Sequence, residues 1–448
     1  MTETLKTNPL SRLIRIYVRH PVLLGICVLI FWSLIFWIKG SLTTPAVGDE
    51  VDYIQRGILL SHQGLSAIAD GYRPPLFVFI CAALSYFFDE HLLLIAVRLL
   101  NIAFVSAIPW AWLSAYKSSG RSNSTFALMS ILTSVWPAYY YFSCQALAEA
   151  ISFLLLNLLL ILTLSFSSQS SHAKNVIKSI TFATIIATLT LSKANNILIA
   201  PACVVLAFYQ LNSKILYKLT LLLVTVTTSI VIIFPWISLV QKTTGEYNLS
   251  TTGGINLLVG TGRYYFGMSD GLDMSALPDR YIANRVEFHK TPYGPSALTS
   301  DQERLLENTK TVWEQDAVSK AASLKIWNEN RYIQCIYGLT KIIHSIGGSI
   351  RGLTDYFSIA FFGLTIVCSL YCLTIKIDRQ IVLTHWLFAL SGFIVAFFYL
   401  PNMRFRTFYF DTTGLLICAT ALHIIFEKLL KQKLNFTLEN NFKQNEKH

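Results

Sequence analysis

The chain has 448 residues, of which 53% are hydrophobic and only 14% are charged, and its mean hydropathy is +0.50. Soluble domains carry about one quarter charged residues, so this balance excludes an ordinary soluble protein and predicts an all-α protein with many membrane-spanning helices. The formal net charge of +11 does not indicate nucleic-acid binding, because the basic residues punctuate the hydrophobic runs instead of forming one patch.

Hydrophobic segments along the chain predict about ten transmembrane helices, since a span needs roughly 20 apolar residues. The predicted spans are residues 20–38, 91–115, 124–144, 149–167, 178–192, 196–212, 218–240, 355–375, 380–400 and 407–427. The basic residues that connect these segments then fall on one side, which the positive-inside rule makes the cytoplasm. We therefore expect both termini in the cytoplasm.

One further apolar segment, residues 74–88, tests this topology. It is short, starts with two prolines and ends at Asp89 and Glu90. If it were a span, the loops between residues 116 and 240 would change sides and their basic residues would lie outside. We therefore predict a helix that lies along the membrane interface or dips partway into it, with a true span as the alternative.

The topology divides the chain into four parts. Residues 1–240 form a transmembrane catalytic module whose first outer loop is 39–90, and residues 241–354 form a long outer loop. That loop is too long for a simple connection, so it must have structure of its own, and we predict a helix over 301–328 and an interfacial helix over 331–350. Residues 355–434 complete the transmembrane part, and the polar tail 435–448 is predicted to be disordered.

An acidic pair, Asp49 and Glu50, follows shortly after the first hydrophobic segment. Packing does not require two adjacent carboxylates just outside a bilayer. An ionised carboxylate can take a proton from an attacking hydroxyl, and two neighbours can divide the base and positioning roles. The same composition also fits a solvated turn.

A second acidic residue, Glu149, stands at the outer end of a strongly apolar segment. An ionisable group at such a place is costly and indicates function. The alternative is that it only stabilises the helix dipole at the helix N-terminus, where an acidic residue is also favourable.

Several cations lie on the predicted outer side, where the positive-inside rule does not explain them. Lys193, Arg404 and Arg406 belong to this group, and Arg98 in the second span could reach the outer headgroups. Such cations can hold a lipid phosphate, although each could instead extend to ordinary headgroups. Asp411 is expected to pair with one of the outer arginines.

Two other patterns do not indicate a cofactor. The eight cysteines lie mostly inside apolar runs without metal-ligand spacing, so we interpret them as small buried hydrophobes. Residues 260–263, Gly-Thr-Gly-Arg, lack the strand-turn-helix context of a nucleotide site. We expect no cofactor; a divalent metal is compatible with the chemistry, but no His and carboxylate cluster demands one.

The outward polar groups together favour one reaction class. A carboxylate base, a set of phosphate-binding cations that includes Arg73, and an aromatic-rich loop meet at a membrane interface. A sugar linked to a polyprenyl phosphate could enter from the bilayer, with its phosphate as the leaving group. The carboxylate would activate an acceptor hydroxyl or amine, and the cations would stabilise the charge on the departing phosphate.

The order of these motifs resembles the lipid-dependent glycosyltransferases of the C superfamily (GT-C), especially the bacterial relatives of protein O-mannosyltransferases (family 39) and of the lipid A aminoarabinose transferase. The resemblance covers nearly the whole chain. It rests on residues 48–53, 71–77, 98–101, 147–149, 192–193, 251–260 and 404–406. In relatives the last motif usually continues toward a proline, which residues 408–413 lack, and this leaves the shape of the last outer turn open.

The resemblance implies an inverting transferase in a bacterial inner membrane, with its site facing the periplasm and a polyprenyl (undecaprenyl) monophosphate sugar as donor. Asp49 is then the expected base, Glu149 the second acidic residue of the site, and Glu50 a third catalytic candidate. The expected phosphate and lipid ligands are Arg73, Lys193, Arg404, Arg406 and Arg98. The expected substrate contacts are Tyr53, Tyr72 and Asn256.

Two alternatives remain open at this point. A flippase or transporter of lipid-linked sugars would place substrate groups near the bilayer midplane, whereas the charged groups here gather at one surface. A polymerase or ligase of surface polysaccharide would use a diphosphate-linked donor instead. The sequence predicts membrane lipids as neighbours, and it leaves open the sugar and whether the acceptor is a lipid, a glycan or a protein.

Overall fold

The computed structural model describes residues 21–115, 123–166, 171–211, 213–258, 260–261, 304–306, 308–329, 331–347, 353–375, 379–399 and 406–445. All regular elements in these ranges are helices, so the fold is all-α. The N-terminal half contains α2 (Pro21–Ile38), α3 (Asp49–Gln63), α4 (Pro75–Ser85), α5 (Glu90–Ala115), α6 (Asn123–Val135), α7 (Pro137–Ser143), α8 (Glu149–Ser165), α9 (His172–Ser192), η3 (Ala194–Ile199), α10 (Ala200–Gln210) and α11 (Ile215–Thr244). The remainder contains α16 (Val312–Glu329), α17 (Arg331–Gly347), α18 (Leu353–Thr374), α19 (Arg379–Phe398), the π-helical turn η4 (Thr407–Asp411) and α21 (Thr412–Asn445).

Six helices within the described ranges are long and apolar enough to cross a membrane. They are Glu90–Ala115, His172–Ser192, Ile215–Thr244, Phe357–Thr374, Arg379–Phe398 and Thr407–Leu429. Shorter apolar helices occupy the other four predicted spans, 20–38, 124–144, 149–167 and 196–212. The fold is therefore that of a polytopic membrane protein, as the composition predicts.

Two of the predicted spans are interrupted. The segment 124–144 is divided into α6 and α7, and Trp136 between them is extended, with φ −71° and ψ 110°. The break follows from Pro137, because a proline disfavours helical geometry in the residue before it. The segment 196–212 begins with the 3-10 helix η3 and continues as α10.

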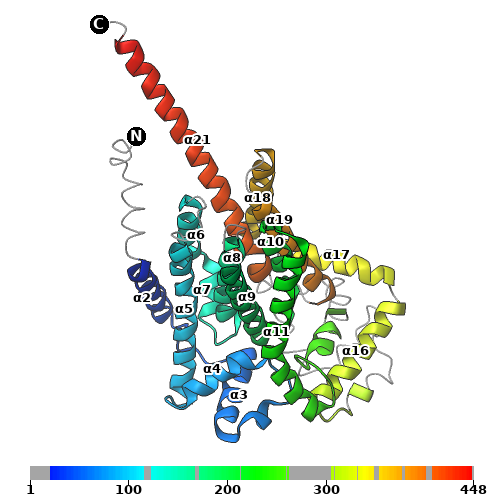
Figure 1. Ribbon diagram of the computed structural model, residues 1–448. Coiled ribbons are helices and arrows are strands. Elements are labelled where there is room, and N and C mark those ends of the chain that lie inside the picture. The colour runs from blue at the N-terminus through cyan, green and yellow to red at the C-terminus, as the bar shows by residue number, and fades with distance from the viewer. Residues whose placement is uncertain are drawn as a thin grey trace.

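The helix α4 occupies the segment whose topology the sequence left open. Its 11 residues rise by roughly 17 Å, whereas the hydrocarbon core is about 30 Å thick, so α4 cannot cross a bilayer by itself. It packs against α3, and Gly57 allows the close approach, since a Cβ there would lie 2.4 Å from Cβ of Cys81. The far end of α21 projects from one end of the bundle, and α3 and α4 lie at the opposite end (Figure 1).

Two hydrophobic cores support this arrangement. The larger core joins the spanning helices, and Trp112, Phe153 and Phe388 are among its fully buried members. A smaller core lies at the α3 and α4 end, where Tyr53 packs edge-on against Phe77 with ring centroids 5.0 Å apart. This second core packs α3 against α4.

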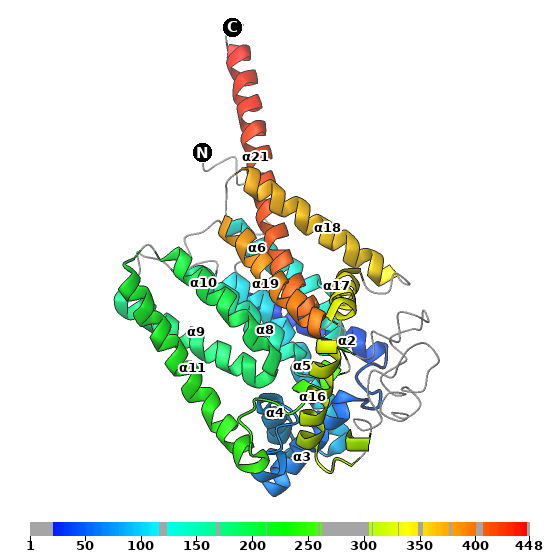
Figure 2. The same cartoon turned by 90° about the vertical axis from the view of Figure 1, so that its right-hand side faces the viewer.

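The long segment 241–354, predicted to be an outer loop, has structure of its own where it is described. Residues 253–258 and 260–261 are helical, and α16 and α17 follow. In both views, α16 lies toward the end of the molecule at which α3 and α4 lie (Figure 1 and Figure 2). The aromatic run at residues 264–266 lies outside the described residues. At the other end of the molecule, α21 continues to Asn445, so the polar tail predicted from residue 435 begins as helix; residues 430–445 contain no proline or glycine to end it.

Candidate functional site

The site begins where α3 begins. Gly48, with φ of +55°, turns the chain into the helix, and the first turn carries Asp49, Glu50 and Asp52. Acidic residues are favourable near a helix N-terminus because they complement its dipole. Since successive helical residues point about 100° apart, Asp49 and Asp52 share one face and Glu50 faces a different direction.

Arg73 joins Asp49 and Asp52 into an acidic cluster. Its Nη2 donates to Oδ1 of Asp49 at 2.6 Å and to Oδ2 of Asp52 at 2.8 Å, and its Nε donates to the same Asp52 oxygen at 3.0 Å. The guanidinium carbon lies 5.2 Å from the ring centre of Tyr53 and 4.8 Å from that of Tyr72. Burial opposes the charge on Arg73, but Asp49 and the neighbouring groups outweigh it, so the pKa of Arg73 lies above its ordinary value. Arg73 is therefore a permanently charged, half-buried anchor.

A second arginine fixes the turn that presents Arg73. Arg56 binds Asp70 through both guanidinium nitrogens at 2.8 Å each, and Oδ1 of Asp70 also accepts the backbone N–H of Tyr72 at 3.1 Å. The ring of Tyr72 lies between the two arginines, with the Arg56 guanidinium carbon 4.8 Å from its centre. The turn at residues 70–73 is thus held by the Asp70 side chain, which binds the Tyr72 N–H, and by Arg56 of α3.

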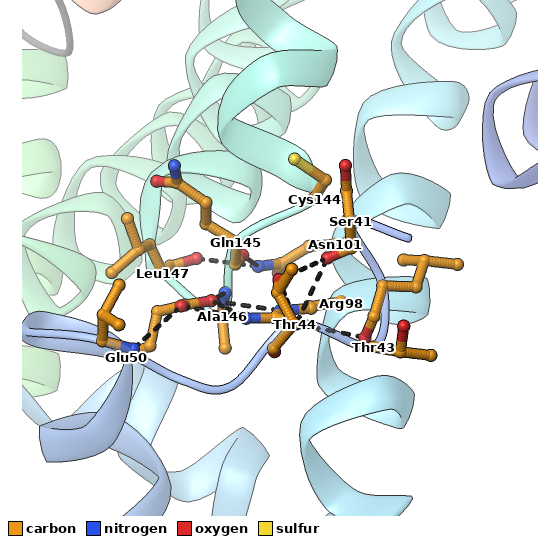
Figure 3. A network of polar contacts seen from close by, with 12 residues as sticks. Ser41, Thr43, Thr44, Glu50, Arg98, Asn101, Cys144, Gln145, Ala146 and Leu147 are labelled. Atoms are coloured by element: carbon orange, nitrogen blue, oxygen red, sulfur yellow. Dashed lines mark hydrogen bonds and ion pairs between the residues drawn. The ribbon is translucent and has the colours of Figure 1, made fainter. Parts of the chain in front are cut away.

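Glu50 takes part in a different and fully buried network (Figure 3). Its carboxylate accepts Nε of Arg98 at 3.1 Å and Nη2 of Arg98 at 3.0 Å, and it accepts the backbone N–H of Ala146 at 2.6 Å. Glu50 is 4% exposed and Arg98 is 2% exposed. Both charges are satisfied within the protein, which is the condition for a buried ion pair to be tolerated.

The same network reaches two backbone segments (Figure 3). Nη1 of Arg98 donates to the carbonyls of Ser41, Leu42 and Thr44 at 3.2, 3.0 and 2.6 Å. One turn further along α5, Nδ2 of Asn101 donates to the carbonyls of Gln145 and Leu147 at 2.7 and 2.9 Å. Thus α5 holds both the loop that leads into α3 and the turn that leads into α8.

Glu149 is the first residue of α8, directly after that turn. It is 3% exposed and pairs with Lys193, whose Nζ lies 2.7 Å from Oε1. Lys193 separates α9 from η3 and keeps 22% of its side chain exposed. Glu50 binds Ala146, three residues before Glu149, so the structure brings the starts of α3 and α8 to the same end of the bundle.

Two arginines near the last span, Arg404 and Arg406, are predicted to bind lipid, and only Arg406 belongs to the described residues. Arg404 lies outside the described residues. Arg406 has a side chain 9% exposed and pairs with Asp411, with Nε to Oδ1 at 3.2 Å and Nη2 to Oδ2 at 3.3 Å. This is the pairing expected for Asp411. Arg406 also borders a mostly apolar pocket between α17, α18, α19 and η4, whose other members include Ser345, Phe362 and Phe410.

The predicted substrate contacts differ in accessibility. Tyr53 is 3% exposed, Tyr72 is half-buried, and Asn256 is exposed on the helical segment 253–261. That segment is tied to the acidic cluster by Thr251, whose N–H donates to the Gly71 carbonyl at 2.8 Å and whose Oγ1 donates to the Asp70 carbonyl at 2.9 Å. Tyr53 therefore supports Arg73 from the core side, and Asn256 is the contact that faces outward.

The structure adds residues that the sequence analysis did not select. Asp52 binds Arg73 through two contacts, and its spacing of three from Asp49 on a predicted helix was a usable signal. Asp70 and Arg56 left no such local signal, because their roles depend on contacts across the fold. Asn101 belongs to the motif at residues 98–101, but that motif did not predict its hydrogen bonds to the turn before α8. Among the described residues, no group of three or more His, Cys, Asp or Glu side chains is placed to hold a metal ion, and the expectation of no cofactor stays a prediction.

Comparison with known proteins gives limited information. No family model and no curated protein matches the chain. The crystal structure of ArnT from Cupriavidus metallidurans bound to undecaprenyl phosphate matches with 14% identity and a TM-score of 0.42, over 89% of this chain and 77% of that one. The apo structure of the same protein matches with 15% identity and a TM-score of 0.39, over 88% and 77%. At these values, neither likeness bears on the reaction that this chain performs.

Proposed function

We propose that the chain is an integral membrane glycosyltransferase of the GT-C type, which moves a sugar from a polyprenyl-monophosphate carrier to an acceptor on the periplasmic side of a bacterial inner membrane. The observation that carries this proposal is the Asp49–Arg73 pair. A partly exposed carboxylate lies 2.6 Å from a guanidinium, and this proximity supports a base next to a phosphate ligand. The sequence motifs that resemble this superfamily supply the reaction class.

In the proposed reaction, the donor phosphate binds Arg73 and competes with Asp49 and Asp52 for the guanidinium. Asp49 then takes the proton from the acceptor hydroxyl or amine as that group attacks the anomeric carbon. The new bond forms on the face opposite the phosphate, the bond from the anomeric carbon to the phosphate oxygen breaks, and the electron pair leaves with the phosphate. The configuration at that carbon is inverted, and the cations stabilise the phosphate charge.

The two other acidic residues take different roles in this proposal. Glu149 holds Lys193 at 2.7 Å, so that the partly exposed ammonium can serve as a second phosphate ligand. Glu50 and Arg98 are engaged with each other and with backbone groups on every side. We assign this buried pair a positioning role, since separating it would leave an uncompensated buried charge.

The carrier's lipid part needs an apolar surface next to a cation. A small cavity of about 20 Å³ between α17, α18, α19 and η4 has a mostly apolar lining, with Phe362, Phe393 and Phe410 among its residues and Arg406 at its edge, and it marks where such a surface lies. A planar guanidinium suits phosphate oxygens because it can donate two parallel hydrogen bonds. Arg404 and Arg406 are therefore the proposed ligands of the carrier where it enters from the bilayer, and Arg406 keeps its pair with the fully buried Asp411 in this proposal.

The test is a mass-spectrometric comparison of envelope glycolipids and glycoproteins from cells that express the wild type, Asp49→Asn, or the matched control Asp89→Asn. Asp89 is an exposed acidic residue of the same outer region, and asparagine preserves its helix-capping oxygen. We expect one hexose or pentose modification to depend on the wild type and to fall by about 10³-fold in Asp49→Asn, the range of a lost general base. The control should retain it.

The same comparison separates the alternatives. A flippase or transporter would lose little in Asp49→Asn, so an unchanged modification contradicts a catalytic base at this position. A polysaccharide polymerase or ligase would accept a diphosphate-linked donor. The purified protein is therefore assayed with undecaprenyl monophosphate and undecaprenyl diphosphate sugars in parallel, and the proposal requires transfer from the monophosphate.

A further inference from the structure

The segment 253–261, helical at residues 253–258 and 260–261, is held at its first turn by a buried carboxylate. Asp316 of α16 is 8% exposed, and its Oδ1 accepts the backbone N–H of Ile255 at 3.0 Å. Burial raises the pKa of Asp316, while backbone N–H groups of Ile255 and Gly254 lower it. The carboxylate thus satisfies N–H groups that have no partner within the first turn of a helix.

The last turn of the same segment is held by a buried cation. Lys341 of α17 is 1% exposed, and its Nζ donates to the carbonyl of Gly260 at 3.1 Å. Burial lowers the pKa of Lys341 to about 7, so near neutral pH the amine is partly protonated, and Nζ can donate to the Gly260 carbonyl in either form. Packing alone would favour an apolar side chain here, and binding the end of a helix explains why a lysine occupies this position.

The two charges match the polarity of the helix that they hold. A helix carries partial positive charge at its N-terminus and partial negative charge at its C-terminus, so an anion at the first turn and a cation at the last turn both stabilise it. A glycine permits contact at each end. A Cβ at Gly254 would lie 2.1 Å from the Asp316 carbonyl, and one at Gly260 would lie 2.6 Å from the Phe398 carbonyl. Close packing thus explains Gly260, which the sequence offered only as a weak phosphate motif.

The segment connects the two halves of the proposed site. On one side, Thr251 binds the carbonyls of Asp70 and Gly71, which directly precede Tyr72 and Arg73. On the other side, the helix α17 that supplies Lys341 also supplies Ser345 to the pocket bordered by Arg406. The segment 253–261 is thus linked to the acidic cluster on one side and, through α17, to that pocket on the other.

We propose that Asp316 and Lys341 are positioning residues that hold the segment 253–261 by its two ends. They thereby fix the acidic cluster around Arg73 relative to the pocket bordered by Arg406. This inference rests on the proposed function for its effect on activity. A donor that contacts both regions must be aligned with Asp49, and misplacement by about 1 Å costs about a hundredfold in rate. The exposed Asn256 is carried on the same helix and is positioned with it.

The experiment uses the full-length purified protein with Asp316→Asn and Lys341→Met, which remove each charge while retaining most of the side chain. Hydrogen exchange of the peptide covering 251–261 is the first measurement, and transfer from an undecaprenyl monophosphate sugar is the second. The matched control is Lys325→Met on α16, since Lys325 is 48% exposed and its nearest carboxylate contact, with Glu329, is 3.9 Å. Lys341→Arg restores the charge.

We expect exchange in 251–261 to accelerate about tenfold in both variants, with the spanning helices unchanged, because a locally held segment opens independently of the rest. Transfer should fall about tenfold to a hundredfold, mainly through kcat, and Lys341→Arg should recover most of it. The control should match the wild type in both measurements. The two residues hold different ends, so either variant alone tests the inference if the other fails to fold.

Unchanged exchange in 251–261 would overturn the inference, and so would faster exchange with unchanged transfer. If the wild type transfers no sugar, the proposed function fails, but the exchange measurement still decides whether these residues hold the helix. The two failures are therefore distinguishable.

Discussion

Asp49 and Glu50 are adjacent carboxylates, yet the structure places them in opposite environments. The Glu50 side chain is 6% exposed and bound by Arg98 and by the backbone of Ala146, whereas the Asp49 side chain is 36% exposed and pairs with Arg73. The difference follows from the helix that starts at Asp49, because consecutive positions point about 100° apart. Two neighbouring residues therefore differ in accessibility: Glu50 is buried within the fold, whereas Asp49 is accessible from solvent.

The partners of the two carboxylates differ in the same way. Arg98 is 2% exposed and donates to three backbone carbonyls as well as to Glu50. Arg73 keeps 19% of its side chain exposed. It forms ion pairs with two carboxylates and cation–π contacts with two aromatic rings. An arginine that has alternative partners at a surface can exchange one of them for a phosphate, whereas a buried pair cannot separate without leaving a charge unpaired.

Removing the buried carboxylate should have the largest effect on stability. Glu50→Ala leaves Arg98 charged in the interior, and we expect a loss of about 3–5 kcal/mol in the free energy of unfolding. Asp49→Ala removes a partly exposed pair and should cost about 1 kcal/mol or less. Thermal unfolding of both variants in the same detergent measures the contrast.

A double variant sharpens this result. Glu50→Gln with Arg98→Met removes both charges, so it should be more stable than Glu50→Ala. If the single and double variants unfold at the same temperature, the pair does not support the fold as inferred. If Asp49→Ala is as unstable as Glu50→Ala, the comparison between the two carboxylates is wrong.

Much of the fold could be predicted from the sequence, because hydropathy is a local property. The segments 91–115 and 380–400 correspond closely to α5 and α19, and the short apolar segment after Pro74 is an 11-residue helix. The bounds of helices were predicted less accurately where backbone geometry, and not hydropathy, decides where a helix ends. Pro137 divides one predicted span into two helices, and a helix of 34 residues, α21, runs past the predicted start of the tail.

The site could be predicted only as a set of candidates. Asp49, Glu149 and Lys193 stand out because charges beside a membrane are costly. Their partners could not be predicted, since Glu50 and Arg98 are 48 positions apart and Glu50 and Ala146 are 96 apart. Such pairings depend on how the helices pack. The roles of these residues in catalysis stay predictions until transfer is measured.

Removal of Lys193 should have an intermediate effect. Lys193→Met takes the cation from Glu149, which is 3% exposed, and the cost of leaving that carboxylate without this partner is about 1–3 kcal/mol. Transfer should fall about tenfold to a hundredfold if Lys193 also binds the donor phosphate. Unfolding temperature and kcat/KM for the undecaprenyl monophosphate donor are the two measurements.

The double variant Glu149→Gln with Lys193→Met separates the two roles. It should recover most of the stability, because no buried charge is left, but none of the activity. Recovery of activity together with stability would mean that Lys193 only neutralises Glu149 and does not contact the donor.

A small effect on stability is expected from Asp70→Asn, because Asp70 contacts the cluster only through the turn at residues 70–73. Asp70→Asn weakens the two-fold contact with Arg56 but keeps an oxygen for the Tyr72 N–H. Both partners are partly exposed, with 15% and 23% of their side chains accessible, so the cost should be about 1 kcal/mol. Asp70→Ala also removes the acceptor for the Tyr72 N–H and should cost about 1 kcal/mol more. Equal stability of the two variants would show that the Tyr72 bond does not hold the turn, and Arg73 would then be positioned by Asp49 and Asp52 without help from Asp70.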